Sequence, residues 1–507
     1  MKNNNENKKS IKNFIISTVL TSIIAIVGLV KSKIFITYLG DSSTGIYQLF
    51  SQLYAYISLV DAGLTGSLLY YLYKPISEND QKQINSILKA GRKFFNIIAI
   101  IIILLGIILS FKLNFFITSG NISNLYIQIC FIIFIISSAT NYFVTTRKTL
   151  FEADQNISTV HLIVYSTMIL RAILEIVLCV CGFNLLSLMI LFLFTSIIQN
   201  ILIIIASKKN YKYLTYSGDE DGSFKKETKN LIFQKIGGII FNNIDIVLIS
   251  KFVGTSSIVI YTCYNYIINS LLNVLKKIGT ASLASVGNLL VTEKEKAKKI
   301  FLEYNAMCFF LGSLVAVPLL FCITPFVRLF YGTNYILPTV GMTCVVIIFF
   351  YKIINITLDV FITALGYFDK IKTATFIEAL INLILSIILI FKFGITGILL
   401  ATVFAYTFGE FIIYPYVLNK YYFNDNKINY YKQSFKLLLG AIISIIIVFV
   451  ITIPFKINNL FIWFIYGVII FILNFIVTIF YYYFTKENDF IKRFYSIIKE
   501  KLKKVKK

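Results

Sequence analysis

The sequence GDSSTGIY at residues 40–47 returns in altered form as GTSSIVIY at residues 254–261. A glycine, two serines, an isoleucine and a tyrosine recur at matching positions of the two copies. Each copy separates two long apolar segments. The recurrence predicts that the chain is duplicated, and that each half opens with a helical hairpin whose tip carries this phrase.

Other landmarks recur at nearly the same spacing as the two copies of the phrase. They are an aspartate before the fifth apolar segment of each half, a glycine in the following turn and a phenylalanine at the third segment: Asp154 and Asp369, Gly182 and Gly397, Phe95 and Phe309. Six segments separate the copies, which predicts two halves of the same orientation, with substrate held between them near the middle of the membrane. The alternative is a chance alignment of common glycine-serine turns within low-complexity apolar sequence.

The composition is that of a membrane protein. Of 507 residues, 58% are hydrophobic, and the mean hydropathy is +0.80. Segments of roughly 20 apolar residues, long enough to cross the bilayer, recur throughout. Because barrel strands of alternating polarity are absent from the sequence, these segments are predicted to be helices. The predicted spans are 13–38, 46–72, 94–117, 124–145, 157–181, 184–206, 231–253, 256–290, 300–324, 336–364, 371–392, 395–419, 435–455 and 459–484.

We therefore expect an all-α polytopic membrane protein of about 14 transmembrane helices. Two pseudo-symmetric six-helix bundles are predicted, with two extra C-terminal helices outside the duplication. The predicted division is as follows: 1–207, the N-terminal bundle; 208–230, a cytoplasmic linker; 231–420, the C-terminal bundle; 421–485, helices 13 and 14; and 486–507, a basic amphipathic cytoplasmic tail.

The net charge of +24 is explained by membrane topology rather than by nucleic-acid binding. Alternate loops hold most of the lysines and arginines, whereas the other loops hold only Lys112, Lys251, Arg328, Lys392 and Lys456. By the positive-inside rule, both termini are predicted to be cytoplasmic. The seven cysteines lie in or near apolar segments without C-x-x-C spacing, so neither a disulfide framework nor a metal site is expected.

Polar residues follow one face of the first two predicted helices of each half. In span 46–72 the polar positions step by four and three, from Tyr47 through Tyr54 to Asp61. Span 231–253 carries Lys235, Asn242 and Asp245 at similar spacing, and span 256–290 carries Asn269, Asn273 and Lys276. Polar faces inside a bilayer are expected to line the transport cavity.

Ionisable residues within apolar segments are the main candidates for function, because each is costly to insert. We predict substrate binding by Lys31, Lys235, Lys276, Arg171, Tyr54, Asn242, Asn269 and Asn273, and gating or ion coupling by Asp61, Asp245 and Glu175. Arg171 and Glu175 are spaced i, i+4 and are equally compatible with a structural ion pair. The other charges inside spans, including Lys33, Lys277, Lys352, Asp359, Glu378 and Glu410, receive no specific role.

The duplication places opposite charges at equivalent positions, because the spacing of the repeat aligns Lys31 with Asp245 and Asp61 with Lys276. We hypothesise that Lys31 pairs with Asp245, and Asp61 with Lys276, when the halves close. The alternative is that each of these four residues interacts with an unrelated residue close to it.

Several stretches resemble the polysaccharide exporters of the multidrug/oligosaccharidyl-lipid/polysaccharide (MOP) superfamily. They are the phrase at 39–47, ISLVDAGL at 57–64, KPISENDQKQINSILKAGRK at 74–93 and the doubled six-span layout. The resemblance implies two six-helix bundles around a cationic cavity that opens alternately to either side. It also implies that Lys31, Lys235 and Lys276 hold the phosphates of an undecaprenyl-linked oligosaccharide.

The function expected from this resemblance is export of a lipid-linked repeat unit of the capsule, O-antigen or teichoic-acid type across a bacterial cell membrane. Membrane lipids and glycan-assembly enzymes are the expected further partners. No cofactor is expected, and no G-x-x-x-x-G-K-[ST] phosphate loop is present in the sequence. One alternative is an ion-coupled multidrug exporter of the same superfamily. A membrane glycan polymerase or ligase is a less favoured alternative, because such enzymes need a sizeable outward loop and the outward connections here are short.

Overall fold

The computed structural model describes residues 2–61, 64–117, 122–223, 244–292, 294–423, 428–452, 455 and 457–493. Within these ranges the chain is helical and contains no strand. Twelve of the described helical stretches are long and apolar enough to cross a membrane. The prediction of an all-α polytopic membrane protein is confirmed. Of the two further predicted spans, 46–72 is interrupted after residue 57, and 231–253 lies mostly outside the described residues.

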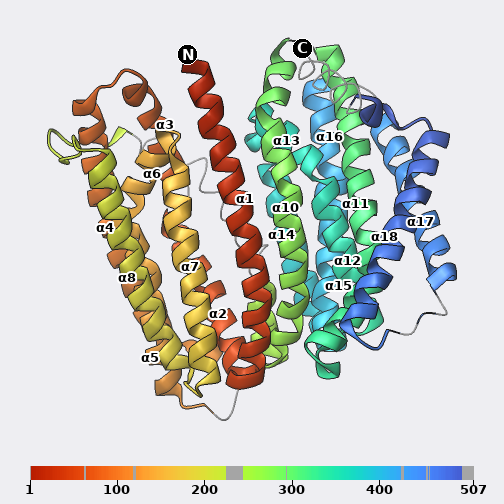
Figure 1. Cartoon of the computed structure of the whole chain (residues 1–507), viewed down its shortest axis with the longest axis horizontal. Helices are drawn as coiled ribbons and strands as arrows, with labels where there is room; N and C mark the ends of the chain where they lie inside the picture. The colour runs from red at the N-terminus through yellow and green to blue at the C-terminus, as the bar shows by residue number, and fades with distance from the viewer. Residues whose placement is uncertain are drawn as a thin grey trace. The chain divides into compact units, whose positions relative to one another are not determined.

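The chain forms two compact units, residues 1–262 and 263–507. The described elements that precede the division are α1 (Lys2–Ile34), η1 (Phe35–Leu39), α2 (Asp41–Ile57), η2 (Ser58–Asp61), α3 (Leu64–Ser77), α4 (Gln81–Ser110), η3 (Leu113–Phe115), α5 (Asn124–Ala139), η4 (Thr140–Val144), α6 (Thr145–Ala153), α7 (Ile157–Val180), α8 (Leu185–Asn210) and a short helix over 244–252. In this first unit α1 packs along α7, and α5 along α8; Figure 1 shows α1 and α7 running side by side.

The division falls within α10 (Ser257–Thr292), which continues into the second unit. The other elements of that unit are α11 (Lys294–Phe330), η6 (Thr333–Tyr335), α12 (Thr339–Ile354), α13 (Ile356–Leu365), α14 (Phe368–Phe393), α15 (Ile395–Tyr406), η7 (Thr407–Ile413), α16 (Tyr414–Leu418), η8 (Asn419–Phe423), α17 (Ile428–Thr452) and α18 (Leu460–Phe484). The division of the chain into five segments, given above from the sequence, stays a prediction.

Helices α4 and α18 begin at capping residues in the sequence. The Asp80 carboxylate accepts from the backbone N–H of Gln83 at the start of α4 (3.0 Å), and Asn459 caps α18 by accepting from Ile462 (2.8 Å). A side-chain oxygen at this position satisfies one of the backbone N–H groups that the first helical turn leaves open. These caps define where the two helices begin, and each apolar stretch then continues without a break.

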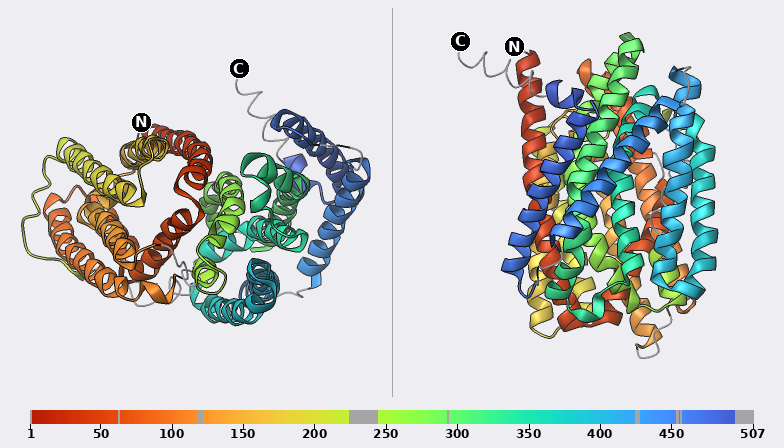
Figure 2. Two further views of the ribbon diagram at one scale, coloured as in Figure 1. Left: turned by 90° about the horizontal axis from the view of Figure 1, so that it is seen from below. Right: turned by 90° about the vertical axis from the view of Figure 1, so that its right-hand side faces the viewer.

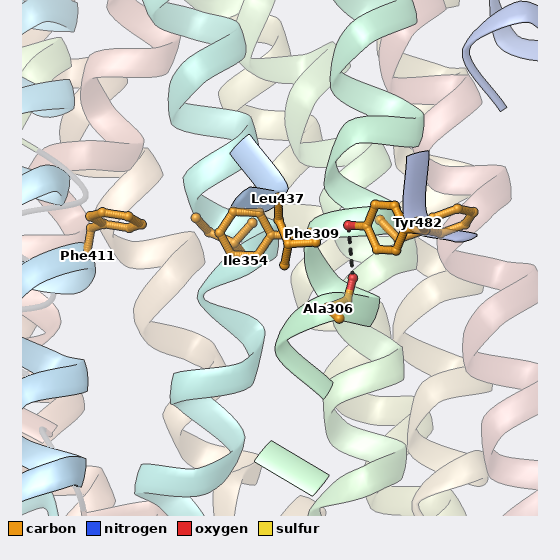
Figure 3. Packing of buried hydrophobic residues seen from close by; sticks show 7 residues of the cluster. Ala306, Phe309, Ile354, Phe411, Leu437 and Tyr482 are labelled. Atoms are coloured by element: carbon orange, nitrogen blue, oxygen red, sulfur yellow. Dashed lines mark hydrogen bonds between the residues drawn. The ribbon is translucent and has the colours of Figure 1, made fainter. Parts of the chain in front are cut away.

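The last two helices pack on α11 of the second unit, and Figure 2 shows them side by side in blue. A cluster that includes Phe309, Leu437 and Tyr482 joins α11, α17 and α18, and the Tyr482 hydroxyl donates to the Ala306 carbonyl (3.2 Å; Figure 3). Deeper in the unit, the Asn474 amide donates to the Ser313 carbonyl (3.0 Å). α17 and α18 are therefore fixed to the rest of the second unit by both apolar packing and buried hydrogen bonds.

Candidate functional site

Each copy of the repeated phrase begins with a glycine of positive φ, and the residues after it lead into a helix. Gly40 has φ +81° and precedes α2, and Gly254 has φ +124° and precedes α10. Such φ angles are readily adopted only by glycine, because it lacks a Cβ atom. The sequence prediction of a tight turn at each copy is confirmed, and each turn leads directly into a helix that carries candidate site residues.

Two cations share one carboxylate inside the first unit. Lys31 Nζ of α1 lies 2.6 Å from Glu175 Oε2 of α7, and Arg171 Nε lies 3.7 Å from Glu175 Oε1. The Glu175 side chain is fully buried, whereas the Lys31 and Arg171 side chains keep 13% and 19% of their exposure. These three groups together carry one net positive charge within the predicted membrane spans. Lys31 and Glu175 come from spans far apart in sequence, so only the fold brings them together.

Aromatic rings surround both cations of this cluster. Lys31 Nζ lies 4.9 Å from the centre of the Phe35 ring and 5.1 Å from that of Tyr47, and the Arg171 guanidinium lies 4.3 Å from the Phe192 ring. Ring faces attract cations, most strongly where water is excluded. The rings therefore hold the two positive charges in place without neutralising them.

Tyr54 and Asp61 share a partner within the first unit. The Tyr142 hydroxyl is within hydrogen-bonding reach of both the Tyr54 hydroxyl and the Asp61 carboxylate. Asp61 belongs to the 3₁₀ segment η2, where the predicted continuous span 46–72 is interrupted. The polar ridge that the sequence predicted along this span is therefore continuous only as far as the end of α2.

Asp245 also lies in the first unit, and it is buried. The Tyr261 hydroxyl donates to Asp245 Oδ2 (2.6 Å), so the tyrosine of the second phrase contacts the acid of the preceding helix. Two other candidates of the predicted span 231–253, Lys235 and Asn242, lie outside the described residues. The predicted pairings of Lys31 with Asp245 and of Asp61 with Lys276 stay a prediction.

In the second unit, three candidates lie on one exposed stretch of α10. Asn269, Asn273 and Lys276 are all exposed, and Lys276 is close enough to Asp359 of α13 for an electrostatic interaction. The spacing of these three residues, four and then three, places them on the same helix face, as their sequence pattern predicted.

Three acids of the second unit, to which the sequence analysis assigned no specific role, form a further cluster. The Tyr414 hydroxyl donates to Glu378 Oε2 (3.4 Å) and lies 2.8 Å from the Thr375 hydroxyl oxygen. Glu378 interacts electrostatically with Glu410, which lies in the π-helical segment η7. Gly409 packs so tightly on the Glu378 carboxylate that an added Cβ would overlap it. Widened π-helical turns recur at functional sites in membrane and soluble proteins alike.

This second cluster has the opposite charge balance to the first. Asp359, Glu378 and Glu410 carry three negative charges if ionised, and Lys276 and Lys352 interact electrostatically with Glu410. In the sequence, each of these five residues is recognisable as a charge inside an apolar segment. The five residues belong to five different helical elements. No periodicity within one element could predict that they gather.

Comparisons with solved structures define the class of fold. The chain is similar to a lipid II flippase, MurJ, in an inward closed conformation, with a TM-score of 0.71, 19% identity, and coverage of 92% of this chain and 99% of that one. It is also similar to an inward-facing multidrug resistance MATE family transporter of the MOP superfamily (TM-score 0.64, 12% identity, coverage of 80% and 97%). A MOP superfamily transporter from Pyrococcus furiosus, described as having a binding pocket of reversed polarity, matches at a TM-score of 0.53 with 13% identity (coverage of 80% and 95%). The chain therefore has the fold of MOP-superfamily transporters.

The family follows from the sequence itself. The family described as polysaccharide biosynthesis protein matches residues 80–337, which is more than half of the chain. The chain belongs to this family, and the resemblance noted from its motifs is confirmed. A search of curated proteins found no match.

Proposed function

We propose that this protein is a flippase that moves an anionic, undecaprenyl-(pyro)phosphate-linked oligosaccharide from the inner to the outer leaflet of a bacterial cell membrane by alternating access. The cargo is a repeat unit of the capsule, O-antigen or teichoic-acid type. Both termini are cytoplasmic in this proposal, as the distribution of lysine and arginine among the loops indicates. The protein acts on its cargo as a transporter and not as an enzyme, with glycan-assembly enzymes as its functional partners.

The observation that carries the proposal is the cluster of Lys31, Arg171 and Glu175. Two cations on one buried acid leave a net positive charge at membrane depth, and the Lys31 side chain retains some exposure. A phosphate that approached Lys31 would be attracted strongly in this low-dielectric setting. A lysine binds phosphate as a point charge and releases it more readily than an arginine fork does.

Aromatic and amide side chains of the two units supply contacts for sugars in this proposal. Tyr54 and the ring of Tyr47 lie on α2, which follows the first repeated turn. In the second unit, Asn269 and Asn273 offer amide groups beside Lys276. Amides can hydrogen-bond sugar hydroxyls, and aromatic rings can pack on the apolar faces of sugars. Lys235 and Asn242 are proposed to act with them.

Membrane potential can supply the driving force. An inside-negative potential favours the outward movement of each uncompensated negative charge by about 2.3 kcal/mol per 100 mV. Export of an anionic headgroup therefore needs no nucleotide hydrolysis. Asp61, Asp245 and Glu175 are proposed to act in gating or in coupling to an ion.

A second candidate function is ion-coupled export of cationic drugs. The acids Asp359, Glu378 and Glu410 favour it, because a surplus of carboxylates in the second unit suits a positively charged cargo or a coupling cation. The two functions predict different essential residues, which are the cations of the first unit for the flippase and the acids of the second unit for the drug exporter.

The test is depletion of the protein in its host, followed by mass spectrometry of undecaprenyl-linked oligosaccharides in each leaflet. We expect the cargo to accumulate in the cytoplasmic leaflet. Complementation with Lys31→Gln or Lys276→Gln should leave that accumulation at least tenfold above wild type at equal protein level, since the loss of about 1.4 kcal/mol of phosphate binding gives a factor of ten.

The matched control is Lys33→Gln, which removes the same charge from the same helix at an exposed position two residues away. This variant should clear the cargo normally. An unchanged leaflet distribution after depletion, together with increased sensitivity to cationic drugs, would instead establish the second candidate. Equal effects of Lys31→Gln and Lys33→Gln would show that the cluster has no specific role in binding the cargo.

A further inference from the structure

A cavity of about 360 Å³ lies within the second unit, and none of the candidate site residues discussed above lines it. It is formed by the first turns of α11, the first turns of α17 and the segment that follows α18. Its wall is amphipathic: Leu302, Ala306 and Phe490 give an apolar side, and four lysines and three acids give a charged side. The size and the mixed wall suit a polar headgroup with an apolar attachment.

Each of the three acids in the wall has a cation of its own. Glu487 accepts from Lys436 Nζ (3.0 Å) and from the Gln433 amide (2.7 Å). Glu303 pairs with Arg493 (2.8 Å) outside the wall. Asp489 pairs with Lys492 (3.2 Å), which also lies outside the wall. The negative charges of the wall are therefore already compensated.

The remaining three lysines of the wall have no ion pair with any acid in the part of the chain that the structure describes. They are Lys299 of α11, Lys432 of α17 and Lys486 after α18, and all three are exposed. Three elements thus bring one uncompensated lysine each to the same cavity. Like charges repel one another, and their convergence favours an anion that all three can contact.

The cavity lies where the apolar spans end. α18 is apolar up to Phe484, which is 89% exposed, and the cavity wall begins two residues later at Lys486. On α17, the exposed side chains of Phe435 and Leu439 each lie three residues after a wall lysine, Lys432 and Lys436 respectively. Exposed apolar side chains beside lysines are typical of the boundary between hydrocarbon and headgroups. The cavity is therefore at headgroup depth, with surfaces beside it for acyl chains.

We propose that this cavity is a binding site for a phosphate-bearing lipid headgroup, held by Lys299, Lys432 and Lys486 against Phe490. The resident ligand is an anionic phospholipid of the phosphatidylglycerol class. A polyprenyl phosphate presents the same phosphate chemistry and is the other source of such a ligand. The site is separate from the transport cluster around Lys31, and the proposal does not depend on which cargo is carried.

The experiment is native mass spectrometry of the full-length protein in detergent, with phosphatidylglycerol, phosphatidylcholine, undecaprenyl phosphate or inorganic phosphate added in turn. We expect phosphatidylglycerol to bind and phosphatidylcholine, which has no net charge, to bind at least tenfold more weakly. The variant Lys299→Gln/Lys432→Gln/Lys486→Gln should bind phosphatidylglycerol at least tenfold more weakly than wild type, because each surface lysine contributes roughly a factor of five to the attraction of anionic lipid.

The matched control is Lys208→Gln/Lys209→Gln/Lys212→Gln, which removes three exposed lysines around the end of α8. It should bind phosphatidylglycerol as wild type does, and both variants should retain the wild-type melting temperature. Equal losses in the two triple variants, or no preference for phosphatidylglycerol over phosphatidylcholine, would overturn the proposal. Tighter binding of undecaprenyl phosphate, or of inorganic phosphate alone, lost in the first variant only, would keep the phosphate site but reject phosphatidylglycerol as its ligand.

Discussion

Gly45 of α2 packs directly on the carbonyl group of Thr255, so that a Cβ atom at residue 45 would overlap the Thr255 oxygen. Gly45 belongs to the first copy of the repeated phrase and Thr255 to the second. Both residues lie in the first compact unit. Nearby, Ser250 donates to the Phe116 carbonyl (2.7 Å), which fixes the helix over 244–252 to the same unit. The phrase is therefore repeated in sequence and also packed on its own copy in space.

The first prediction tests this contact. Gly45→Ala should lower the free energy of unfolding by about 1–3 kcal/mol or more, because overpacking against rigid backbone cannot relax through a side-chain rotation. Gly28→Ala is the control, since a Cβ at that helical glycine meets nothing within 4 Å. The measurement is the thermal unfolding midpoint in detergent, and a Gly45→Ala midpoint equal to wild type would contradict the contact.

The second prediction concerns the buried Glu175. Glu175→Gln should destabilise the protein by about 3–5 kcal/mol, because it leaves Lys31 and Arg171 without their shared acid. The double variant Lys31→Met/Glu175→Gln removes one stranded cation and should recover part of that loss. Additive losses in the double-mutant cycle would show that the 2.6 Å pair is not energetically coupled.

The third prediction uses the excess of acid in the second unit. Glu410→Gln should raise the unfolding midpoint by about one degree, which corresponds to about 1 kcal/mol for a chain of this length, because it removes a buried carboxyl beside Glu378 and Asp359. Lys352→Gln should lower the midpoint, because it removes a cation that interacts with Glu410. Shifts of the same sign in both variants would refute this charge account.

The fourth prediction concerns the segment after α8, which is fastened to α4. The Asn85 side chain accepts from the backbone N–H groups of Thr215 (2.8 Å) and Tyr216 (2.9 Å) and donates to the Tyr213 carbonyl (2.9 Å). Asn85→Ala should release the segment, since it strands these buried backbone groups at about 1–3 kcal/mol.

Limited chymotrypsin digestion measures that release, and cleavage after Tyr213 or Tyr216 should become at least tenfold faster. Gln83→Ala is the control, because Gln83 is exposed on the same helix turn. Unchanged cleavage in Asn85→Ala would mean that the stacking of Arg92 and Arg147 on the Tyr216 ring holds the segment without the amide.

The class of protein follows from signals that are local in the sequence. Apolar runs of sufficient length, lysine-rich alternate loops and the phrase that recurs at 254–261 predict a duplicated helical membrane protein, because each of these signals is local to a single segment. The turns at Gly40 and Gly254 were predicted for the same reason, since a tight turn constrains only its own residues. The polar face of α10 also follows from helical spacing alone.

Which charges meet depends on how the helices pack. Lys31 and Glu175 are 144 residues apart, and their pairing depends on the packing of α1 along α7. The cavity lined by Lys299, Lys432 and Lys486 needs three helical elements to converge at the end of the apolar spans. Electrostatic partners act over a few ångströms in space and carry no periodicity along the chain, so a single sequence shows the charged residues but not how they pair.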